Sequence, residues 1–253
     1  MSTFAVSPSS GFPVGPDAPA DLEAWRSAAV ARGYGYTAEW IDPGFAGLLF
    51  REGKDVVATA VVDARGGSVP FIAGSLTAHY AAVGGAIETS FIGFPLSRSM
   101  PSVVLVNARR GALRLANIGM GSRQMFSLHG DFDRAFTLYG PLGHESVALD
   151  VFTPDLMQMF LEAIPGSDAE LVDDWLFVYG TAGRCTSPDS LDRIERLATR
   201  VHDEIVRRNF DSLHVAPTPV ARVSGARMLR FSALLAVAAV AAGALAWLTL
   251  TGG

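Results

Sequence analysis

Residues 56–62 read VVATAVV, a run of β-branched and small side chains with no charge and no turn residue. β-branched residues favour extended strands. A run that is apolar at both odd and even positions is typical of a strand with both faces covered. Val56–Val62 therefore predicts a central strand of a sheet.

Similar short runs surround this strand, and glycine-containing turns such as Glu52-Gly53-Lys54 and Arg65-Gly66-Gly67 separate them. Spacings of roughly 8–15 residues between turns are typical of antiparallel strands in a meander. The predicted strands are Phe45–Arg51, Val56–Asp63, Val69–Tyr80, Ile87–Phe94, Val103–Ala108, Ala112–Ile118, Phe136–Tyr139 and Glu170–Tyr179.

Two helix starts follow the strand-rich region. Thr153 is a suitable N-cap with Pro154 in the first turn, and this helix ends at Pro165-Gly166. Ser187 and Pro188 start a longer helix that is expected to run to about Leu213. Its apolar stripe consists of Leu191, Ile194, Leu197, Val201 and Ile205, with Phe210 as a further candidate. A further helical stretch begins at Asp21 and ends near Gly33–Gly35. The sequence thus predicts an α+β fold, in which the Thr153 and Ser187 helices cover a mostly antiparallel, twisted sheet.

The C-terminal region has a different character. Residues 231–250 read FSALLAVAAVAAGALAWLTL and carry no charge. As a helix this stretch would be about 30 Å long, the thickness of the hydrocarbon core of a bilayer. Its Leu, Val and Phe residues favour insertion by very roughly 2.5–5 kcal/mol in sum. We expect a single-pass transmembrane helix here, with the span marked by Phe231, Leu234, Leu235, Gly243, Trp247 and Leu250.

Positive charges precede this stretch and none follows it. Arg222, Arg227 and Arg230 are expected to lie on the cytoplasmic side, at the level of the lipid headgroups, and to orient the protein. The first 25 residues have no basic and apolar segments typical of a signal peptide. The expected localisation is a tail-anchored membrane protein whose N-terminal domain is cytoplasmic.

This organisation predicts four parts: a disordered tail at 1–20, a cytoplasmic α+β domain at 21–213, a basic juxtamembrane linker at 214–230 and the transmembrane helix at 231–250. Ala239 and Gly243 have the spacing of small residues that lets membrane helices approach closely, which is compatible with a homodimer through the span.

Charge and cysteine content exclude several classes of protein. The chain has 20 Lys and Arg against 25 Asp and Glu, and the last forty residues hold three Arg and no acid, which leaves 17 basic and 25 acidic residues in 1–213. An acidic domain argues against nucleic-acid binding. Cys185 is the single cysteine, so an internal disulfide and a cysteine-based metal cluster are excluded.

Three motifs with the composition of functional sites have simpler interpretations. Asp173-Asp174 would point to opposite faces of a strand, which does not suit an acid/base pair. His129-Gly130-Asp131-Phe132-Asp133 lacks the further ligands that a calcium or zinc site needs and is interpreted as a polar turn. Gly119-Met120-Gly121-Ser122 lacks the remaining features of a phosphate loop. The sequence therefore predicts no cofactor and no metal.

A basic cluster is the one further candidate site. It consists of Arg109, Arg110, Arg114 and Arg123, which could bind an anionic ligand or lipid phosphates, although solvated turn residues are the ordinary explanation.

One region resembles a group of uncharacterised bacterial membrane-anchored proteins. The matching features are Phe132-x-x-x-Phe136-x-Leu138, where Val is commoner than Leu138, the helix start Thr153-Pro154-Asp155-Leu156-Met157, and the later aromatic strand Asp173–Tyr179. The match covers about residues 132–213. It implies a membrane-associated domain of unknown function and carries over no catalytic residue.

Together these features favour a membrane-tethered binding or adaptor module with an unidentified protein partner, because a tether raises the local concentration of a module near membrane partners. Two alternatives remain open. One is a membrane-bound hydrolase or transferase whose site is assembled from distant residues, and the other is an accessory subunit of a membrane complex. The sequence favours a protein that is not an enzyme.

Overall fold

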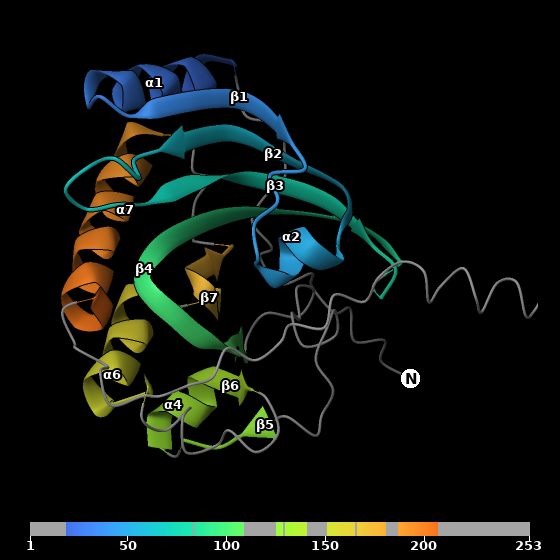
Figure 1. Cartoon of the computed structure of the whole chain (residues 1–253), viewed down its shortest axis with the longest axis vertical. Coiled ribbons are helices and arrows are strands. Elements are labelled where there is room, and N and C mark those ends of the chain that lie inside the picture. Colours follow the sequence, from blue (N-terminus) through green and yellow to red (C-terminus); the bar gives the residue numbers. More distant parts are fainter. Residues whose placement is uncertain are drawn as a thin grey trace, which may run out of the picture. The chain divides into compact units, whose positions relative to one another are not determined.

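An antiparallel sheet of seven strands is the framework of the protein (Figure 1). The computed structural model describes residues 19–82, 84–108, 125–128, 130–140, 151–164, 166–180 and 187–206. All of them belong to the first of two units of the chain, Met1–Pro217. The strand order is β1-β2-β3-β4-β6-β5, and β7 pairs with β4. The strands are β1 Gly35–Ile41, β2 Lys54–Asp63, β3 Ile72–Tyr80, β4 Gly85–Asn107, β5 Met125–Phe126, β6 Phe136–Tyr139 and β7 Asp168–Tyr179.

This architecture confirms the predicted α+β class and the mostly antiparallel sheet, since every strand pair is antiparallel. β2 pairs with a strand on each side, as predicted for residues 56–62. The helices are α1 Pro19–Ala31, α2 Leu48–Glu52, α4 Gly130–Ala135, α6 Pro154–Ala163 and α7 Pro188–Val201, and a π-helical turn, η2 His202–Val206, continues α7.

The two predicted helix caps are present. The Thr153 hydroxyl accepts a hydrogen bond from the backbone N–H of Leu156 at 3.4 Å, and the Ser187 hydroxyl accepts one from that of Ser190 at 3.2 Å. Both satisfy donors at a helix start that would otherwise have no partner in the helix. α6 and α7 therefore begin where the sequence predicted.

β4 is the strand on which the sheet depends. The two strands predicted at Ile87–Phe94 and Val103–Ala108 are parts of this single strand of 23 residues. Its first part pairs with β3, its last part pairs with β6, and β7 follows it along most of its length. The β4–β7 register shifts on both sides of Met100, where the pair bends. Figure 1 shows β4 as a curved ribbon with α6 and α7 outside the bend and α2 inside it.

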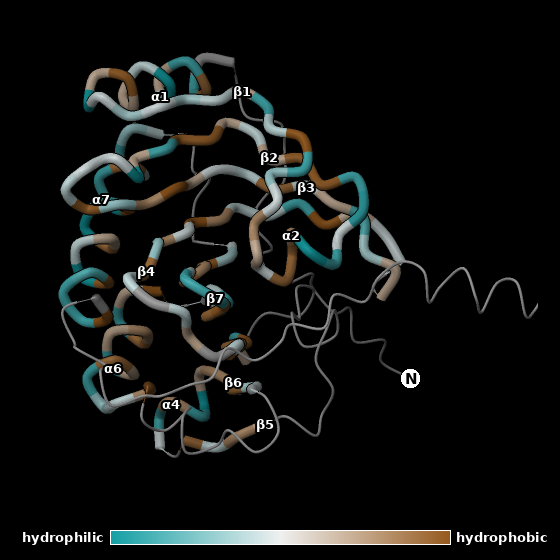
Figure 2. Tube along the Cα trace, in the orientation of Figure 1, coloured by the Kyte–Doolittle hydropathy of each residue, from teal (hydrophilic) through white to brown (hydrophobic). Residues whose placement is uncertain are grey.

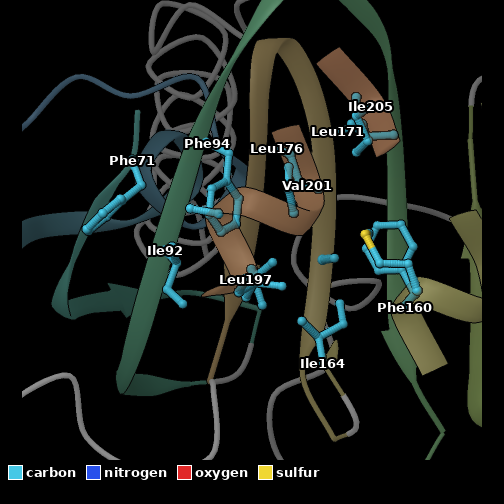
Figure 3. Close-up of a cluster of buried hydrophobic side chains, with 14 of the residues drawn as sticks. Phe71, Ile92, Phe94, Phe160, Ile164, Leu171, Leu176, Leu197, Val201 and Ile205 are labelled. Atoms are coloured by element: carbon cyan, nitrogen blue, oxygen red, sulfur yellow. The ribbon is translucent and has the colours of Figure 1, made fainter. Parts of the chain in front are cut away.

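The sheet consequently has two different faces. The helical face packs against α1, α6 and α7, and Figure 3 shows part of its core, in which Leu197, Val201 and Ile205 meet strand residues such as Ile92 and Leu171. The five described residues of the predicted apolar stripe of the Ser187 helix are buried here, and Phe210 lies outside the described residues. Hydrophobic and hydrophilic segments alternate along α7 in Figure 2, as expected for a helix with one side on a sheet. α1 covers this face in addition to the two predicted helices.

The opposite face, which we call the α2 face, packs against α2 and the residues that precede it. Its buried residues are Leu48, Leu49, Phe50, Val56, Ala58, Val61, Ile72, Leu76, Ala78, Tyr80, Phe91, Val104, Val106, Val172, Phe177 and Tyr179.

The structure also differs from the sequence prediction at residues 48–51 and at β1. Residues 48–51, predicted as extended within Phe45–Arg51, lie in α2. Three consecutive residues, Leu48, Leu49 and Phe50, are buried there, and this tertiary packing overrides the β-propensity of the run. β1 was not predicted, because five of its seven residues are exposed and it shows no alternation of apolar and polar residues.

Several predicted segments lie outside the described residues: most of the tail at 1–20, the strand at Ala112–Ile118, the linker at 214–230 and the span at 231–250. Within the part of the chain that the structure describes, no helix combines the length and the apolar character needed to traverse a bilayer.

Candidate functional site

The candidate site residues taken from the sequence lie outside the part of the chain that the structure describes. Arg109, Arg110, Arg114 and Arg123 lie outside the described residues. The same holds for Arg222, Arg227 and Arg230, for the span residues Phe231, Leu234, Leu235, Gly243, Trp247 and Leu250, and for Cys185 and Gly119–Ser122. Their predicted roles stay predictions.

The remaining motifs have structural roles. Asp173 and Asp174 are both exposed within β7. Residues 130–133, interpreted from the sequence as a polar turn, instead lie in the short helix α4. Asp133 accepts a hydrogen bond from the backbone N–H of Leu128 at 2.9 Å, and Asp131 pairs with Arg134 at the surface of α4. Across the described ranges, no group of three or more His, Cys, Asp or Glu side chains is arranged to hold a metal ion.

The structure instead draws attention to a buried carboxylate, Glu170. This residue is 0% exposed on the α2 face. Its Oε2 atom accepts a hydrogen bond from the backbone N–H of Leu48 at 2.6 Å and another from the Tyr179 hydroxyl at 3.1 Å. Its Oε1 atom is also buried and has no hydrogen-bond partner among the described residues. A buried glutamate is unusual, because removing its charge from water is unfavourable.

The bend of β7 brings Glu170 and Tyr179 together. They are nine positions apart on the same strand, which would be about 30 Å in a straight strand. β7 bends near Asp173, whose φ of 49° is a conformation that non-glycine residues seldom adopt. Met100, opposite Asp173, marks the matching irregularity in β4. The two halves of β7 therefore supply one buried carboxylate and its hydroxyl donor.

The helix α2 is held over this pair by close contacts. The Tyr80 hydroxyl donates a hydrogen bond to the backbone oxygen of Leu49 at 2.6 Å, next to the Leu48 N–H that binds Glu170. Gly47, directly before α2, lies against the rings of Tyr179 and Phe177. Two tyrosines and one glutamate from the sheet thus fix the first turn of α2.

An aromatic cluster continues from this site towards the surface. Trp175, Phe177 and Tyr179 stack in a row along β7, with ring centroids 5.3 Å and 6.0 Å apart. Phe45 lies at the outer end, 5.3 Å from Trp175 and 5.6 Å from Trp40. We call the half-buried residues Trp40, Phe45 and Trp175 the aromatic rim. The site therefore combines a buried proton-binding group with apolar rings that solvent reaches.

Burial controls the protonation of the site. Removal from water raises the pKa of Glu170 to about 7, although the Leu48 N–H, the Tyr179 hydroxyl and the charge of Arg51 act in the opposite direction. Asp173 adds to the upward shift. Burial and the neighbouring Glu170 also raise the pKa of Tyr179 far above its usual value, so its hydroxyl remains a donor. Glu170 is consequently able to gain or lose a proton near neutral pH.

Gly47→Ala is expected to destabilise the protein by about 1–3 kcal/mol, the usual result of overpacking a closely packed site. A Cβ atom at this position would lie only 2.9 Å from Cδ2 of Phe177, and would also meet the Tyr179 hydroxyl. Urea denaturation provides the measurement. Gly66→Ala is the matched control, because no atom lies within 4 Å of a Cβ there. Equal stability of the two variants would show that residue 47 is not closely packed.

Sequence inspection missed this site for an identifiable reason. Glu170 begins the run ELVDDWLFVY, in which the adjacent pair Asp173-Asp174 is the more evident candidate for carboxylate chemistry. Strand alternation places Glu170 on the same face as Val172. A charged residue at a position expected to be buried was therefore the sequence feature that could have indicated the site. Its contact with Tyr179 requires the bend at Asp173, which no local pattern indicates.

Comparison with known proteins identifies the fold. No family model and no curated protein sequence matches this chain. Its structure is similar to the crystal structure of the mycobacterial trehalose monomycolate transport factor A, TtfA, with a TM-score of 0.51 and 15% sequence identity. The match covers 80% of this chain and 99% of that chain. The arrangement of strands and helices described above is thus shared by a solved protein along almost its whole length.

Proposed function

We propose that this chain is a membrane-tethered accessory module that binds a partner of a membrane transport process. The uncharged stretch at residues 231–250 is the observation that carries the tether. The three arginines before it support a cytoplasmic position for the α+β domain. The described domain would then act beside the bilayer.

The accessory role in transport is supported by the similarity of fold. TtfA is a transport factor for trehalose monomycolate by its name, and this chain covers nearly all of its structure. A factor of this kind suits a tethered domain, because tethering increases the frequency of encounters with other membrane components.

The aromatic rim is the part of the described surface that best suits a partner. Trp40, Phe45 and Trp175 are partly buried against the α2 face, so each presents part of its ring to solvent. Aromatic residues are enriched in protein interfaces, since large rigid rings give contact area at a low entropic cost. We place the partner contact at this rim.

Membrane association is expected to be lost when a charge is introduced into the apolar stretch. An arginine at the centre of a membrane helix disfavours insertion by roughly 2.5–3.5 kcal/mol, comparable with the total that favours it. Val240→Arg should therefore move the full chain from the membrane pellet to the supernatant after ultracentrifugation of broken cells. Ser224→Arg adds the same charge in the linker and is expected to stay in the pellet. A soluble wild-type chain would contradict the tether.

The partner is tested separately from the tether. Full chains carrying Trp175→Ala are compared with wild type by crosslinking in membranes and purification from a detergent extract. Ile41→Ala is the control, since Ile41 is an apolar side chain on β1 that is 70% exposed. Selective loss of one crosslinked protein in the Trp175 variant would support the rim. The same crosslinks in all three proteins would exclude it as the contact site.

A further inference from the structure

Glu170 connects the sheet to α2 through the backbone of a single residue. The N–H of Leu48 is the first donor of α2, and its 2.6 Å hydrogen bond reaches Oε2 of Glu170. The Tyr179 hydroxyl donates to the same oxygen, so both donors meet one side of the carboxylate. The other oxygen, Oε1, is buried without a hydrogen-bond partner among the described residues. If Glu170 is ionised, the protein therefore stabilises its negative charge by hydrogen bonds to only one of its two oxygens.

The neighbouring charged groups do not compensate for burial. Arg51, on α2, attracts the carboxylate, but its guanidinium also pairs with Glu52 at 3.2 Å and its side chain is 30% exposed. Asp173, on β7, repels it. Tyr80, on β3, binds the backbone oxygen of Leu49 rather than Glu170. The groups that face Glu170 thus leave its ionised form unfavourable while α2 covers it.

We propose that α2 is a proton-controlled latch: it is held closed over the sheet while Glu170 is protonated, and its opening becomes more frequent as the carboxylate ionises and takes up water. Opening would expose the inner part of the aromatic cluster, including Phe177, next to the aromatic rim. The latch is independent of the proposed membrane tether and partner, since it needs only contacts within the described domain.

The direction follows from the two protonation equilibria. The pKa of Glu170 is about 7 in the closed form, and its ordinary value in water is 4.5. The form with the lower pKa is favoured as pH rises, which here is the open form. Between pH 5.5 and pH 8 the opening equilibrium is expected to increase about 30-fold. Most α2 segments still remain closed, because Leu48, Leu49 and Phe50 are buried in that state.

Native-state hydrogen exchange on the full chain in detergent micelles tests the latch. Exchange at residues 48–52 is followed between pH 5.5 and 8, corrected for the intrinsic chemical rate, at several low urea concentrations. We expect these amides to exchange through a local opening that is insensitive to urea, whereas the amides of β3 exchange through a urea-dependent opening. Coincident urea dependence of α2 and β3 would overturn the proposal, because α2 would then open only with the whole domain.

Two variants test the role of the carboxylate. Glu170→Gln keeps an acceptor oxygen but cannot ionise, so the 30-fold change with pH should disappear. Tyr179→Phe removes a hydrogen bond that favours the ionised form in the closed state, so the increase in opening should continue to a higher pH before it levels off. A pH response that persists in Glu170→Gln would assign the effect to another group. Where a variant does not fold, the wild-type hydrogen exchange between pH 5.5 and 8 still tests whether α2 opens locally and whether its opening increases with pH.

Discussion

Phe177→Ala is expected to lower the free energy of unfolding by about 3–5 kcal/mol, the range observed for truncating a fully buried phenylalanine. Phe177 is 0% exposed and stands at the centre of the α2 face. Its ring lies between Trp175 and Tyr179 and contacts Phe45 and Phe50, with centroids 5.9 Å and 5.4 Å away. Truncation would leave a cavity between β7 and α2. Urea denaturation followed by circular dichroism measures the loss.

Ile41→Ala is the matched control for this truncation. Ile41 is 70% exposed on the edge strand β1, where removal of an apolar side chain should change stability by no more than about 0.5 kcal/mol. A loss below about 1 kcal/mol in Phe177→Ala would show that the α2 face is loosely packed, and would remove the basis for treating α2 as a fixed cover.

The stability of the whole domain is expected to decrease by about 3 kcal/mol as pH rises from below 4.5 to above 7, through Glu170 alone. The folded protein holds this proton more tightly than the unfolded chain, since the pKa is raised from 4.5 to about 7. In that window the folded state binds more protons, so a higher pH favours unfolding. The contribution is complete below the unfolded pKa and is lost as pH passes the folded one.

The measurement is the difference between wild type and Glu170→Gln in urea denaturation across pH 4.5 to 8. A difference is needed because other groups also make the stability depend on pH. Hydrogen bonds from Arg65 lower the pKa of Asp63, so the contribution of Asp63 to stability is lost as pH falls, which is opposite to the pH dependence expected from Glu170. Parallel stability curves for the two proteins would contradict a raised pKa at Glu170.

Much of the framework was predictable from local chemistry. The starts of α6 and α7 follow from a hydroxyl N-cap followed by proline, and the buried stripe of α7 follows from helical spacing. β6 was predicted at its observed bounds, Phe136–Tyr139. These features depend on residues that are close in sequence, so a pattern in the chain is sufficient to locate them.

The site depends on contacts that no local pattern contains. Leu48 is bound by Glu170, 122 positions later in the chain. α2 is helical because the sheet buries three of its residues, against the extended tendency of the run. The bend that joins Glu170 to Tyr179 relies on a left-handed backbone conformation at Asp173. Glycine is the residue that usually marks such a conformation, and this position is an aspartate. Long-range packing therefore created the features that sequence inspection missed.

The shared strand β4 also determines how the chain can reach its native state. Its pairing with β3 joins neighbouring segments, but its pairing with β7 joins residues roughly 60–90 positions apart, whose ends must meet before the contact is gained. Until β7 arrives, one long edge of β4 has unpaired amides and carbonyls beside apolar side chains, which is a template for association with other chains. We therefore expect slow refolding, and aggregation at high protein concentration, as kinetic consequences of this topology.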